Sequence, residues 1–476
     1  MKRAIRWYDY ITFNVYWFAL TARSQVLTPL VLPLLVQSFV GEETKGTYMG
    51  TMRLWALMVA LLMQALMGMF SDRSTHPWGR RRPFILAGTI GEVIIFMLMG
   101  FTAGLEGMTG FWVLFVLYIF SMISSNTAHA ATQGIIPDLV PEEKRGRFSG
   151  VKALFELPLP LIFVSFVVGK LVAAGNLWGA LIALSLAMLA SMGIAMLVPE
   201  KQLEKDPGPL DWQPILRLLL MTAAFTVIIL GAGRGVKVGT AWATDNALSN
   251  ANIIAILIGL LGMSIAVGLG VWISVRISVG ERAEQNPSFT WWVVNRLAFL
   301  VGVNNIASFV VYFLQEKFPE LSGAQAAGPA SRLVLFVGVF ILLTALPSGW
   351  LADRFGRKPV LVFSGLIAAA GTFLIVLATD MTLIYVGGCM IGGGAGFFYT
   401  ANWALGTDIV PRLQAGRYLG ISNLAGAGAG AVGAYIGGPI GDMLGYSLLM
   451  AIYGILFLFS LLALFKIKEP HGGTAA

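Results

Sequence analysis

The chain has 476 residues, of which 57% are hydrophobic and only 12% are charged. Soluble domains carry roughly a quarter charged residues, so this composition excludes an ordinary soluble protein and indicates a surface that faces lipid. The formal net charge is +8, but lysine and arginine gather in short gaps between long apolar runs. That pattern is typical of membrane proteins and argues against a nucleic-acid-binding patch. The single cysteine, Cys389, excludes an intrachain disulfide.

Fourteen apolar runs are long enough to cross a bilayer. The hydrocarbon core needs about 20 apolar residues in a helix, and separate spanning segments must be helical because every backbone N–H needs a partner there. In chain order the runs lie near residues 11–39, 47–70, 83–104, 110–136, 148–173, 177–198, 214–232, 252–275, 289–315, 332–352, 358–378, 382–407, 417–440 and 446–466. We therefore predict an all-α polytopic membrane protein.

The runs divide the chain into three parts. Residues 1–200 form an N-terminal set of six spans, 201–286 hold two extra central spans, and 287–476 form a C-terminal set of six. This grouping predicts two six-helix bundles joined by a central pair of helices, fourteen in total. The alternative is that the run at 214–232 lies flat on the membrane.

Basic residues between the runs predict the orientation. With the N-terminus inside, the inner gaps hold Arg73, Arg80, Arg81, Arg82, Lys144, Arg145, Arg147, Lys201, Lys205, Arg276, Arg282, Arg354, Arg357, Lys358, Arg412, Arg417, Lys466 and Lys468. The outer gaps hold few basic residues, namely Lys45, Lys170, Arg234, Lys237 and Lys317. Because lysine and arginine are concentrated in cytosolic loops, we predict a multi-pass protein of the plasma membrane (the inner membrane if bacterial) with both termini cytosolic. The asymmetry requires an even number of central spans, which favours two.

Two loop motifs occur twice, in the same order. GMFSDRSTHPWGRRRPF at 68–84 and GWLADRFGRKPV at 349–360 share G-x-x-x-D-R, then G-R-[RK] and a proline. PDLVPEEKRGRFSG at 137–150 matches TDIVPRLQAGRYLG at 407–420. Two motifs that recur at matching positions indicate two homologous halves. Parallel repeats of this kind predict a substrate site near the bilayer midplane, between the halves.

These loops resemble the signature of the major facilitator superfamily, G-x-x-x-D-R-x-G-R-[RK]. The resemblance covers nearly the whole chain and implies a transporter that works by alternating access. Within the superfamily, SDRSTHPWGRRRPF and the span NTAHAATQGIIPD at 126–138 are most similar to sucrose carriers and the wider glycoside–cation symporters. Where plant sucrose carriers have an arginine, this chain has Gln133, so the resemblance implies a sugar without specifying sucrose. The central pair of spans also departs from the usual twelve.

The resemblance implies that the charged loops form an inner gate, which holds the bundles together while the site faces outward. The predicted gate residues are Asp72, Arg73, Arg80, Asp138, Arg147, Asp353, Arg354, Arg357, Asp408 and Arg417. Asp72 and Asp353 can each pair with an arginine and can face the positive N-terminus of a neighbouring helix. Losing one partner of a part-buried pair leaves a costly charge. The alternative is that these arginines only set the topology.

Ionisable residues inside spans are costly and often mark functional sites. Those well inside the predicted spans are Arg23, Glu92, His129, Glu156 and Arg296. Glu92 lies in a helix that the resemblance places outside the cavity, so we expect it to be a structural residue that faces protein. Arg23 is in the first span and is predicted to take part in proton coupling.

Glu156 is the predicted proton-coupling site, with His129 as its partner. The two residues lie at nearly equal distances on either side of the turn near Glu142. An antiparallel hairpin would therefore put them at similar depth, where their side chains can face each other. Pro158 and Pro160 follow at once and are expected to interrupt the helix. The alternative is a core histidine and an unrelated buried acid.

Neutral polar and aromatic residues are concentrated on spans that the resemblance places around a central cavity. The predicted substrate-binding residues are Asn14, Trp17, Gln25, Asn126, Gln133, Asn304, Asn305, Tyr399, Asn402 and Trp403. Amides bind hydroxyl groups and flat rings pack on C–H faces, so this set favours an uncharged polyhydroxylated ligand. Some of these side chains are expected to serve only as polar contacts between helices.

The sequence therefore predicts a secondary active transporter, most simply a proton-coupled sugar or glycoside symporter that acts as a monomer. We expect neither enzymatic activity nor a cofactor, a metal or a nucleic-acid partner. The alternatives are an exporter or facilitator of another small solute and, from another class, a membrane enzyme or channel. The sequence shows no clustered nucleophile, metal-ligand group or repeated filter. The glycines at 428, 430 and 433 match the dinucleotide-binding motif G-x-G-x-x-G, but the strand that this motif requires does not precede them. We therefore interpret these glycines, and the glycine-rich stretch at 392–396, as sites of close helix packing.

Overall fold

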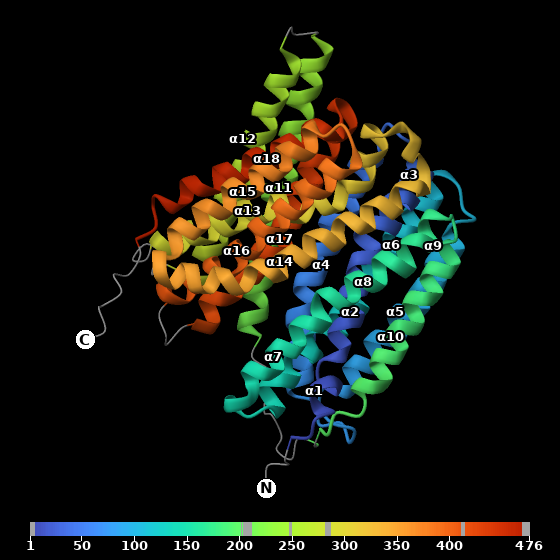
Figure 1. Cartoon of the computed structure of the whole chain (residues 1–476), viewed down its shortest axis with the longest axis vertical. Helices are drawn as coiled ribbons and strands as arrows, with labels where there is room; N and C mark the ends of the chain where they lie inside the picture. Colours follow the sequence, from blue (N-terminus) through green and yellow to red (C-terminus); the bar gives the residue numbers. More distant parts are fainter. Residues whose placement is uncertain are drawn as a thin grey trace. The chain divides into compact units, whose positions relative to one another are not determined.

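Every regular element of the computed structural model is a helix in the part of the chain that it describes (Figure 1). That part comprises residues 5–200, 202, 212–246, 250–280, 287–410 and 415–468, with all side chains except those of residues 251, 279 and 415–423. The predicted all-α fold class is therefore confirmed.

The first six spans are built from short and long helices in series. They comprise α1 (Asp9–Thr12), α2 (Val15–Val26), η1 (Leu27–Val31), α3 (Leu32–Val40), α4 (Lys45–Asp72), α5 (Arg82–Thr102), α6 (Gly107–Leu139), α7 (Glu142–Glu156), α8 (Pro158–Phe163), η2 (Val164–Val168), α9 (Gly169–Ala173) and α10 (Leu177–Ala195). The π-helical turn η1 contains Pro29, which has no N–H to donate to an α-helical ladder. The wider turn coincides with that missing donor.

The fifth span is interrupted where the prolines predict. Leu157, between α7 and α8, has φ −121° and ψ −75°, outside the helical region. Pro158 follows it, and a proline restricts the preceding residue and removes one donor from the ladder. The break separates the charged first half of the span, which ends at Glu156, from the apolar second half.

Eight further long helices follow. They are α11 (Gln213–Asp245), α12 (Ala251–Val279), α13 (Pro287–Lys317), α14 (Ala327–Phe355, preceded by the 3₁₀ turns η4, Pro319–Leu321, and η5, Gly323–Ala326), α15 (Arg357–Leu377), α16 (Met381–Ile409), α17 (Ala415–Leu444) and α18 (Tyr446–Leu464). Within the described residues, thirteen spans are long and apolar enough to cross a membrane, and α17, with 30 residues, is a further long helix. The prediction of fourteen helices is confirmed. The 33-residue α11 is among the thirteen, which favours a spanning segment over one lying flat.

The chain forms two compact units, which are described separately. The first comprises Met1–Gly41, Val59–Ile215 and Glu320–Leu335, and the second comprises Glu42–Met58, Leu216–Pro319 and Phe336–Ala476. The start of α4 therefore packs within the second unit and the start of α14 within the first. These units cut across the predicted borders near residues 200 and 286. The extra helix α12 packs on α13, α17 and α18 in the second unit.

Glycines let helices of the second unit approach closely. A Cβ at Gly392 would collide with the carbonyl oxygen of Val337, and one at Gly396 with that of Ile341, so these two glycines set the contact of α16 with α14. In α17, a Cβ at Gly433 would collide with the amide of Asn305. The interpretation of both glycine-rich stretches as packing sites agrees with these contacts.

Candidate functional site

Arg81 is the centre of a charged cluster in the first unit. Its guanidinium donates to Oδ2 of Asp138 on α6, over 2.9 Å from Nη2 and 3.0 Å from Nε, and it pairs with Asp72 at the end of α4. Arg80 approaches the other oxygen of Asp138 to 2.5 Å. The Arg81 side chain is only 5% exposed. Removing its carboxylate partners would therefore leave a costly buried charge.

Arg357 forms the corresponding cluster in the second unit. It stands two residues before a proline, at the same motif position as Arg81. Its Nη1 lies 2.5 Å from Oδ1 of Asp353, and its Nε lies 3.4 Å from Oδ2 of Asp408. Since these aspartates are more exposed than their counterparts, water weakens the pairs. The sequence prediction names Arg80 and omits Arg81, because four extra residues in the first motif obscure the alignment.

The other predicted gate residues have different surroundings. The guanidinium of Arg354 lies over the ring of Trp350, 5.3 Å from its centre. Arg147 is exposed on α7, and Arg73 is half-buried just after α4. Arg417 lies in α17, but its side chain is outside the described residues.

Glu200 joins the end of the sixth span to the start of the third. Its Oε2 accepts hydrogen bonds from the backbone N–H groups of Arg81, at 2.9 Å, and Arg82, at 3.0 Å. A carboxylate is favoured there because the first N–H groups of α5 have no helical partner and the helix dipole is positive. Gly79 has φ 104°, and a Cβ would meet the Glu200 side chain. The sequence prediction missed Glu200, whose only signal is an acid directly after an apolar run.

A buried ion pair connects α2 with α5. Arg23 donates from Nε to Oε1 of Glu92 at 2.7 Å, and the Ser121 hydroxyl on α6 donates to the same oxygen at 2.7 Å. The two charged side chains are 7% and 0% exposed. No donor among the described residues reaches Oε2 of Glu92. This burial agrees with the expectation that Glu92 faces protein. The guanidinium of Arg23 is its ion-pair partner.

A row of four side chains crosses α6, α2 and α7 in the first unit. The rings of His129 and Trp17 meet edge to face with centres 5.4 Å apart. The Lys152 ammonium lies 3.7 Å from the centre of the Trp17 ring. Lys152 also pairs with Oε2 of Glu156, one helical turn later, at 3.4 Å. Gln133 reaches the His129 ring at 3.1 Å.

This row changes the predicted partnership of Glu156. The ion-pair partner that the structure gives to Glu156 is Lys152, and the ring that His129 contacts is that of Trp17. The lysine and the tryptophan therefore stand between the two residues that the sequence prediction paired. Lys152 was missed, although its spacing of four residues from Glu156 is the usual signal of a helical ion pair.

The remaining predicted amides of the first unit make local contacts. Asn14 is fully buried and donates to the carbonyl of Tyr10 at 2.9 Å, and Asn126 donates to that of Met122 at 2.8 Å. Both bonds run back one turn within the same span. Gln25 is half-buried on α2. Each of these asparagines therefore donates to the backbone of its own span, and the buried amide oxygen of Asn14 has no partner among the described residues.

Asn402 is the centre of a polar cluster in the second unit. Its side chain donates to Oδ1 of Asn295 at 2.9 Å and accepts from Nη1 of Arg296 at 2.9 Å. Its backbone carbonyl accepts from the indole N–H of Trp292 at 2.8 Å. Arg296 also lies 5.6 Å from the ring centre of Trp403, which is 45% exposed. The predicted Asn402 and Trp403 are therefore brought together by Arg296, which the predicted set of binding residues omits.

Two further residues of the predicted substrate-binding set make hydrogen bonds between helices. Asn305 is fully buried and donates to the carbonyls of Val301, at 2.9 Å, and Ala429, at 3.1 Å. Asn304 donates to the carbonyl of Gly426 at 3.2 Å. Both asparagines join α13 to α17, as polar side chains commonly do between membrane helices. Tyr399 is half-buried on α16, one turn before Trp403.

Asp442 caps the first turn of α4, at the other end of that helix from Asp72. Its two carboxylate oxygens accept hydrogen bonds from the backbone N–H groups of Gly46 and Thr47, each at 2.7 Å, and the Tyr446 hydroxyl donates to Oδ1 at 2.8 Å. A Cβ at Gly46 would meet these same groups. The end of α17 thereby caps the start of α4. The sequence prediction missed Asp442, because nothing local to it indicates a partner almost 400 residues away.

Two family models match the chain. The model described as MFS/sugar transport protein matches residues 32–232, and the one described as Major Facilitator Superfamily matches residues 297–476. The first match covers most of the N-terminal set of spans and continues into α11. The second covers most of the C-terminal set, so both repeats are recognised independently.

Curated relatives match shorter stretches. D-xylose-proton symporter-like 2 from Arabidopsis thaliana is 26% identical over 165 residues, 32% of this chain and 32% of that protein. Multidrug resistance protein MdtG from Enterobacter lignolyticus (strain SCF1) is 32% identical over 196 residues, 40% of this chain and 45% of that one. The chain thus matches less than half the length of either relative.

Solved structures share the fold along almost the entire chain. The crystal structure of a D-xylose-proton symporter superposes with a TM-score of 0.64 over 98% of both chains, at 17% identity. At an identity this low, the superposition shows a shared fold and nothing more. The two family models, with which this fold agrees, establish that the chain belongs to the major facilitator superfamily of membrane transporters.

Proposed function

We propose that this chain is a proton-coupled symporter of a sugar or glycoside. The sugar-transport family model over residues 32–232 supports this. A relative named D-xylose-proton symporter-like 2 and a solved structure of a D-xylose-proton symporter support it too. The observation that carries the proposal is the row His129, Trp17, Lys152 and Glu156. It joins an aromatic ring, which Lys152 covers, to a carboxyl group that can take up a proton, so a change at the carboxyl can reach the ring.

In the first unit, the sugar is proposed to use a donor that the fold leaves unpaired. The indole N–H of Trp17 is buried, and no acceptor among the described residues reaches it. Buried polar groups are normally hydrogen-bonded, so a hydroxyl group of the substrate would satisfy it. In the second unit, taken by itself, Nε of Arg296 is also buried and no described acceptor reaches it, and the exposed ring of Trp403 lies beside that arginine.

Glu156 is proposed to carry the proton. Its side chain is 41% exposed, whereas Glu92 is fully buried and already paired with Arg23. A proton on Oε2 of Glu156 neutralises the carboxylate that attracts Lys152. The ammonium is then held by the Trp17 ring alone, and any shift of the lysine changes the surface offered to the sugar. Proton binding and sugar binding would be coupled through this lysine.

The charged clusters are proposed to act as gates. The clusters around Arg81 and Arg357 are assigned to the cytosolic ends of the spans, because basic residues gather there. The Asp442 cluster is assigned to the outer ends, since it lies at the other end of α4. Opening at one end would require breaking the polar contacts there, and proton and sugar binding would bias which set breaks.

The second candidate function is export of another small solute. It is favoured by the relative MdtG, whose match to this chain is longer than that of the symporter-like relative and which is named as a multidrug resistance protein. An exporter driven by protons would exchange the two species in opposite directions, whereas a symporter moves them together. Direction of coupling therefore separates the two candidates.

The test is uptake of a panel of labelled sugars and glycosides into proteoliposomes, with and without a pH gradient. The proposal expects at least one sugar to accumulate only when protons flow inward with it. Accumulation driven by outward proton flow, or a failure of every sugar while other solutes are transported, would favour the exporter. Empty liposomes and a Glu156→Gln protein serve as controls for leak and for coupling.

A further inference from the structure

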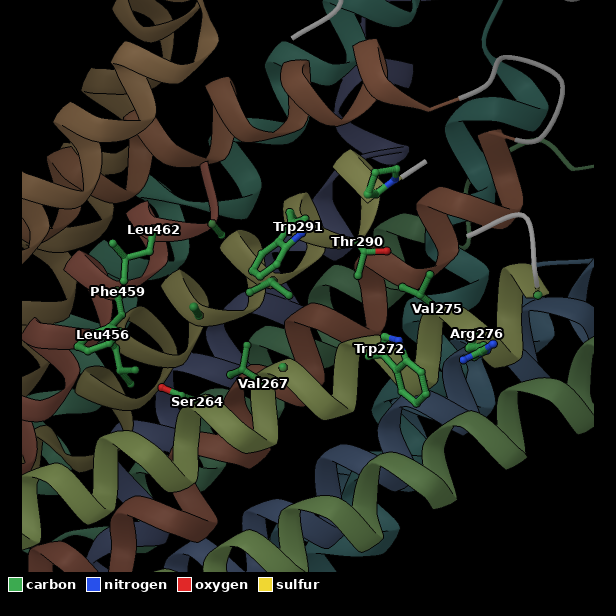
Figure 2. Close-up of a pocket in the computed structure, with 16 residues that line it drawn as sticks. Ser264, Val267, Trp272, Val275, Arg276, Thr290, Trp291, Leu456, Phe459 and Leu462 are labelled. Atoms are coloured by element: carbon green, nitrogen blue, oxygen red, sulfur yellow. The ribbon is translucent and has the colours of Figure 1, made fainter. Parts of the chain in front are cut away.

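A lateral groove lies between α12, α13 and α18 of the second unit (Figure 2). Its volume is about 600 Å³, and its walls are chiefly the apolar side chains Val267, Trp272, Trp291, Leu456, Phe459 and Leu462. Trp272, Phe459 and Leu462 are between 44% and 56% exposed. The groove is therefore open at the side of the helices, and its chiefly apolar walls suit a hydrocarbon chain better than a sugar.

One end of the groove is charged. Arg276 is the sole charged residue among those that line it, and it lies in the last turn of α12. Its guanidinium is 5.0 Å from the ring centre of Trp272, one turn earlier. In Figure 2, Arg276 lies at the end opposite Leu456 and Phe459. Arginine and tryptophan together at the end of a spanning helix are typical of the membrane–water interface.

The length of the groove matches one leaflet of a bilayer. Ser264 and Arg276 both line it and are separated by twelve residues of α12, or about 18 Å of helix. Half of the hydrocarbon core is about 15 Å thick. A molecule with a charged head at Arg276 and a hydrocarbon tail along the apolar wall would therefore end near the bilayer midplane.

We propose that this groove binds one phospholipid with an anionic headgroup. The headgroup phosphate pairs with Arg276, since basic pockets between membrane helices on the cytosolic side favour anionic lipids. The acyl chains fill the apolar length as far as Ser264 and Leu456. Because the groove walls come from an extra helix and from two helices of the C-terminal set, the lipid stabilises the attachment of α12 to that set.

The test uses two substitutions that separate the head from the tail. Arg276→Gln removes the cation, and Gly268→Leu fills the groove, because a Cβ at Gly268 would point into open space. Matched controls lie on α11, outside the groove: Arg217→Gln is another exposed basic residue, and Gly231→Leu is another helical glycine whose Cβ meets nothing. The full chain is purified in detergent, and its affinity for phosphatidylglycerol and phosphatidylcholine is measured by native mass spectrometry.

The proposal predicts that the unsubstituted protein retains phosphatidylglycerol in preference to phosphatidylcholine. Arg276→Gln should lower the affinity for phosphatidylglycerol about fivefold and leave the affinity for phosphatidylcholine unchanged. Arg276→Lys should keep most of the preference for phosphatidylglycerol. Gly268→Leu should abolish retention of both lipids while the melting temperature of the protein shows that it still folds.

Three results would overturn the proposal. Equal affinity for both lipids would show that Arg276 does not select an anionic headgroup. An equal loss of phosphatidylglycerol affinity in Arg276→Gln and Arg217→Gln would mean that the lipid is attracted by the general positive charge of the protein. Retention of phosphatidylglycerol by Gly268→Leu would place the lipid elsewhere. A Gly268→Leu protein that does not fold still leaves the Arg276 pair of substitutions to decide.

Discussion

The ammonium group of Lys152 lies 3.7 Å from the centre of the Trp17 ring, while the same lysine pairs with Glu156 at 3.4 Å. A cation–π contact contributes about 0.5–2 kcal/mol, depending on how dry it is, and a part-exposed ion pair contributes about 1 kcal/mol or less. The two attractions are thus of similar size. A single proton on Glu156 is enough to change which of them holds the lysine.

Lys152→Gln should uncouple sugar accumulation from the pH gradient. The lysine is the side chain that joins Glu156 to the Trp17 ring, so without it a change at the carboxyl no longer reaches the ring. We expect accumulation driven by a pH gradient to fall several-fold while exchange of labelled for unlabelled sugar continues. The measurement is sugar uptake into proteoliposomes with and without a pH gradient. Lys144→Gln, at an exposed position near the start of the same helix, is the control and should keep both activities.

Asp72→Asn and Asp353→Asn should each slow transport more than they weaken sugar binding. Both carboxylates lie at the ends of helices, beside Arg81 and Arg357, and are assigned to gates and not to the substrate. Equilibrium binding in detergent, compared with initial uptake rates, measures the two effects. A parallel loss of binding and transport in both variants would show that the gate assignment is wrong.

Arg81→Ala should destabilise the protein more than Arg357→Ala. Arg81 is 5% exposed and holds two aspartates, whereas Arg357 is 25% exposed and its partners are wetter. We expect a loss of about 3 kcal/mol for the buried cluster and of under about 1 kcal/mol for the exposed one. Unfolding in mixed micelles measures both. Equal losses would mean that burial does not distinguish the two copies of the motif.

Asp442→Ala should loosen the end of α4 that Asp442 caps. The substitution removes both acceptors of the Gly46 and Thr47 N–H groups. The probe is Thr47→Cys in a Cys389→Ser background. With Asp442→Ala added, this cysteine should react several-fold faster with a membrane-impermeant maleimide added outside than it does when Asp442 is present. Asp380→Ala is the control, because Asp380 caps the start of another helix, α16. Its carboxylate accepts from the backbone N–H groups of Leu383 and Thr382, and these hydrogen bonds lower the pKa of the carboxyl. An unchanged rate in Asp442→Ala would contradict the assignment of this cap to the outer gate.

The spans could be predicted because length and hydrophobicity are local properties. The repeat also identified Arg357 and Asp408, which the structure joins, because both lie in motifs that occur twice. Contacts between distant segments could not be predicted in this way. Glu200 and Asp442 act on the starts of helices far away in the sequence, and each is an acid at the end of an apolar run, a position that carries no signal of its partner.

The sequence offered residue types for the candidate site, but it could not predict how they pair. Trp17, His129 and Glu156 do lie in one row, but the depth argument joined the histidine directly to the acid and omitted Lys152. Similarly, Asn305 has the right chemistry for a sugar but is fully buried against α17. Side-chain direction around a helix decides such cases, and the spacing of polar residues alone does not determine it.

The central claim is that Glu156 carries the coupled proton, and Glu156→Gln tests it most directly. Proteoliposomes containing this variant are loaded for two assays, accumulation of sugar driven by a pH gradient and exchange of labelled for unlabelled sugar without one. Glu143→Gln, an exposed carboxyl on the same helix, is the matched control. The account predicts that Glu156→Gln loses accumulation and keeps exchange, while the control keeps both. Undiminished pH-driven accumulation in Glu156→Gln would contradict it, and the buried Glu92 would then be the carboxyl to examine.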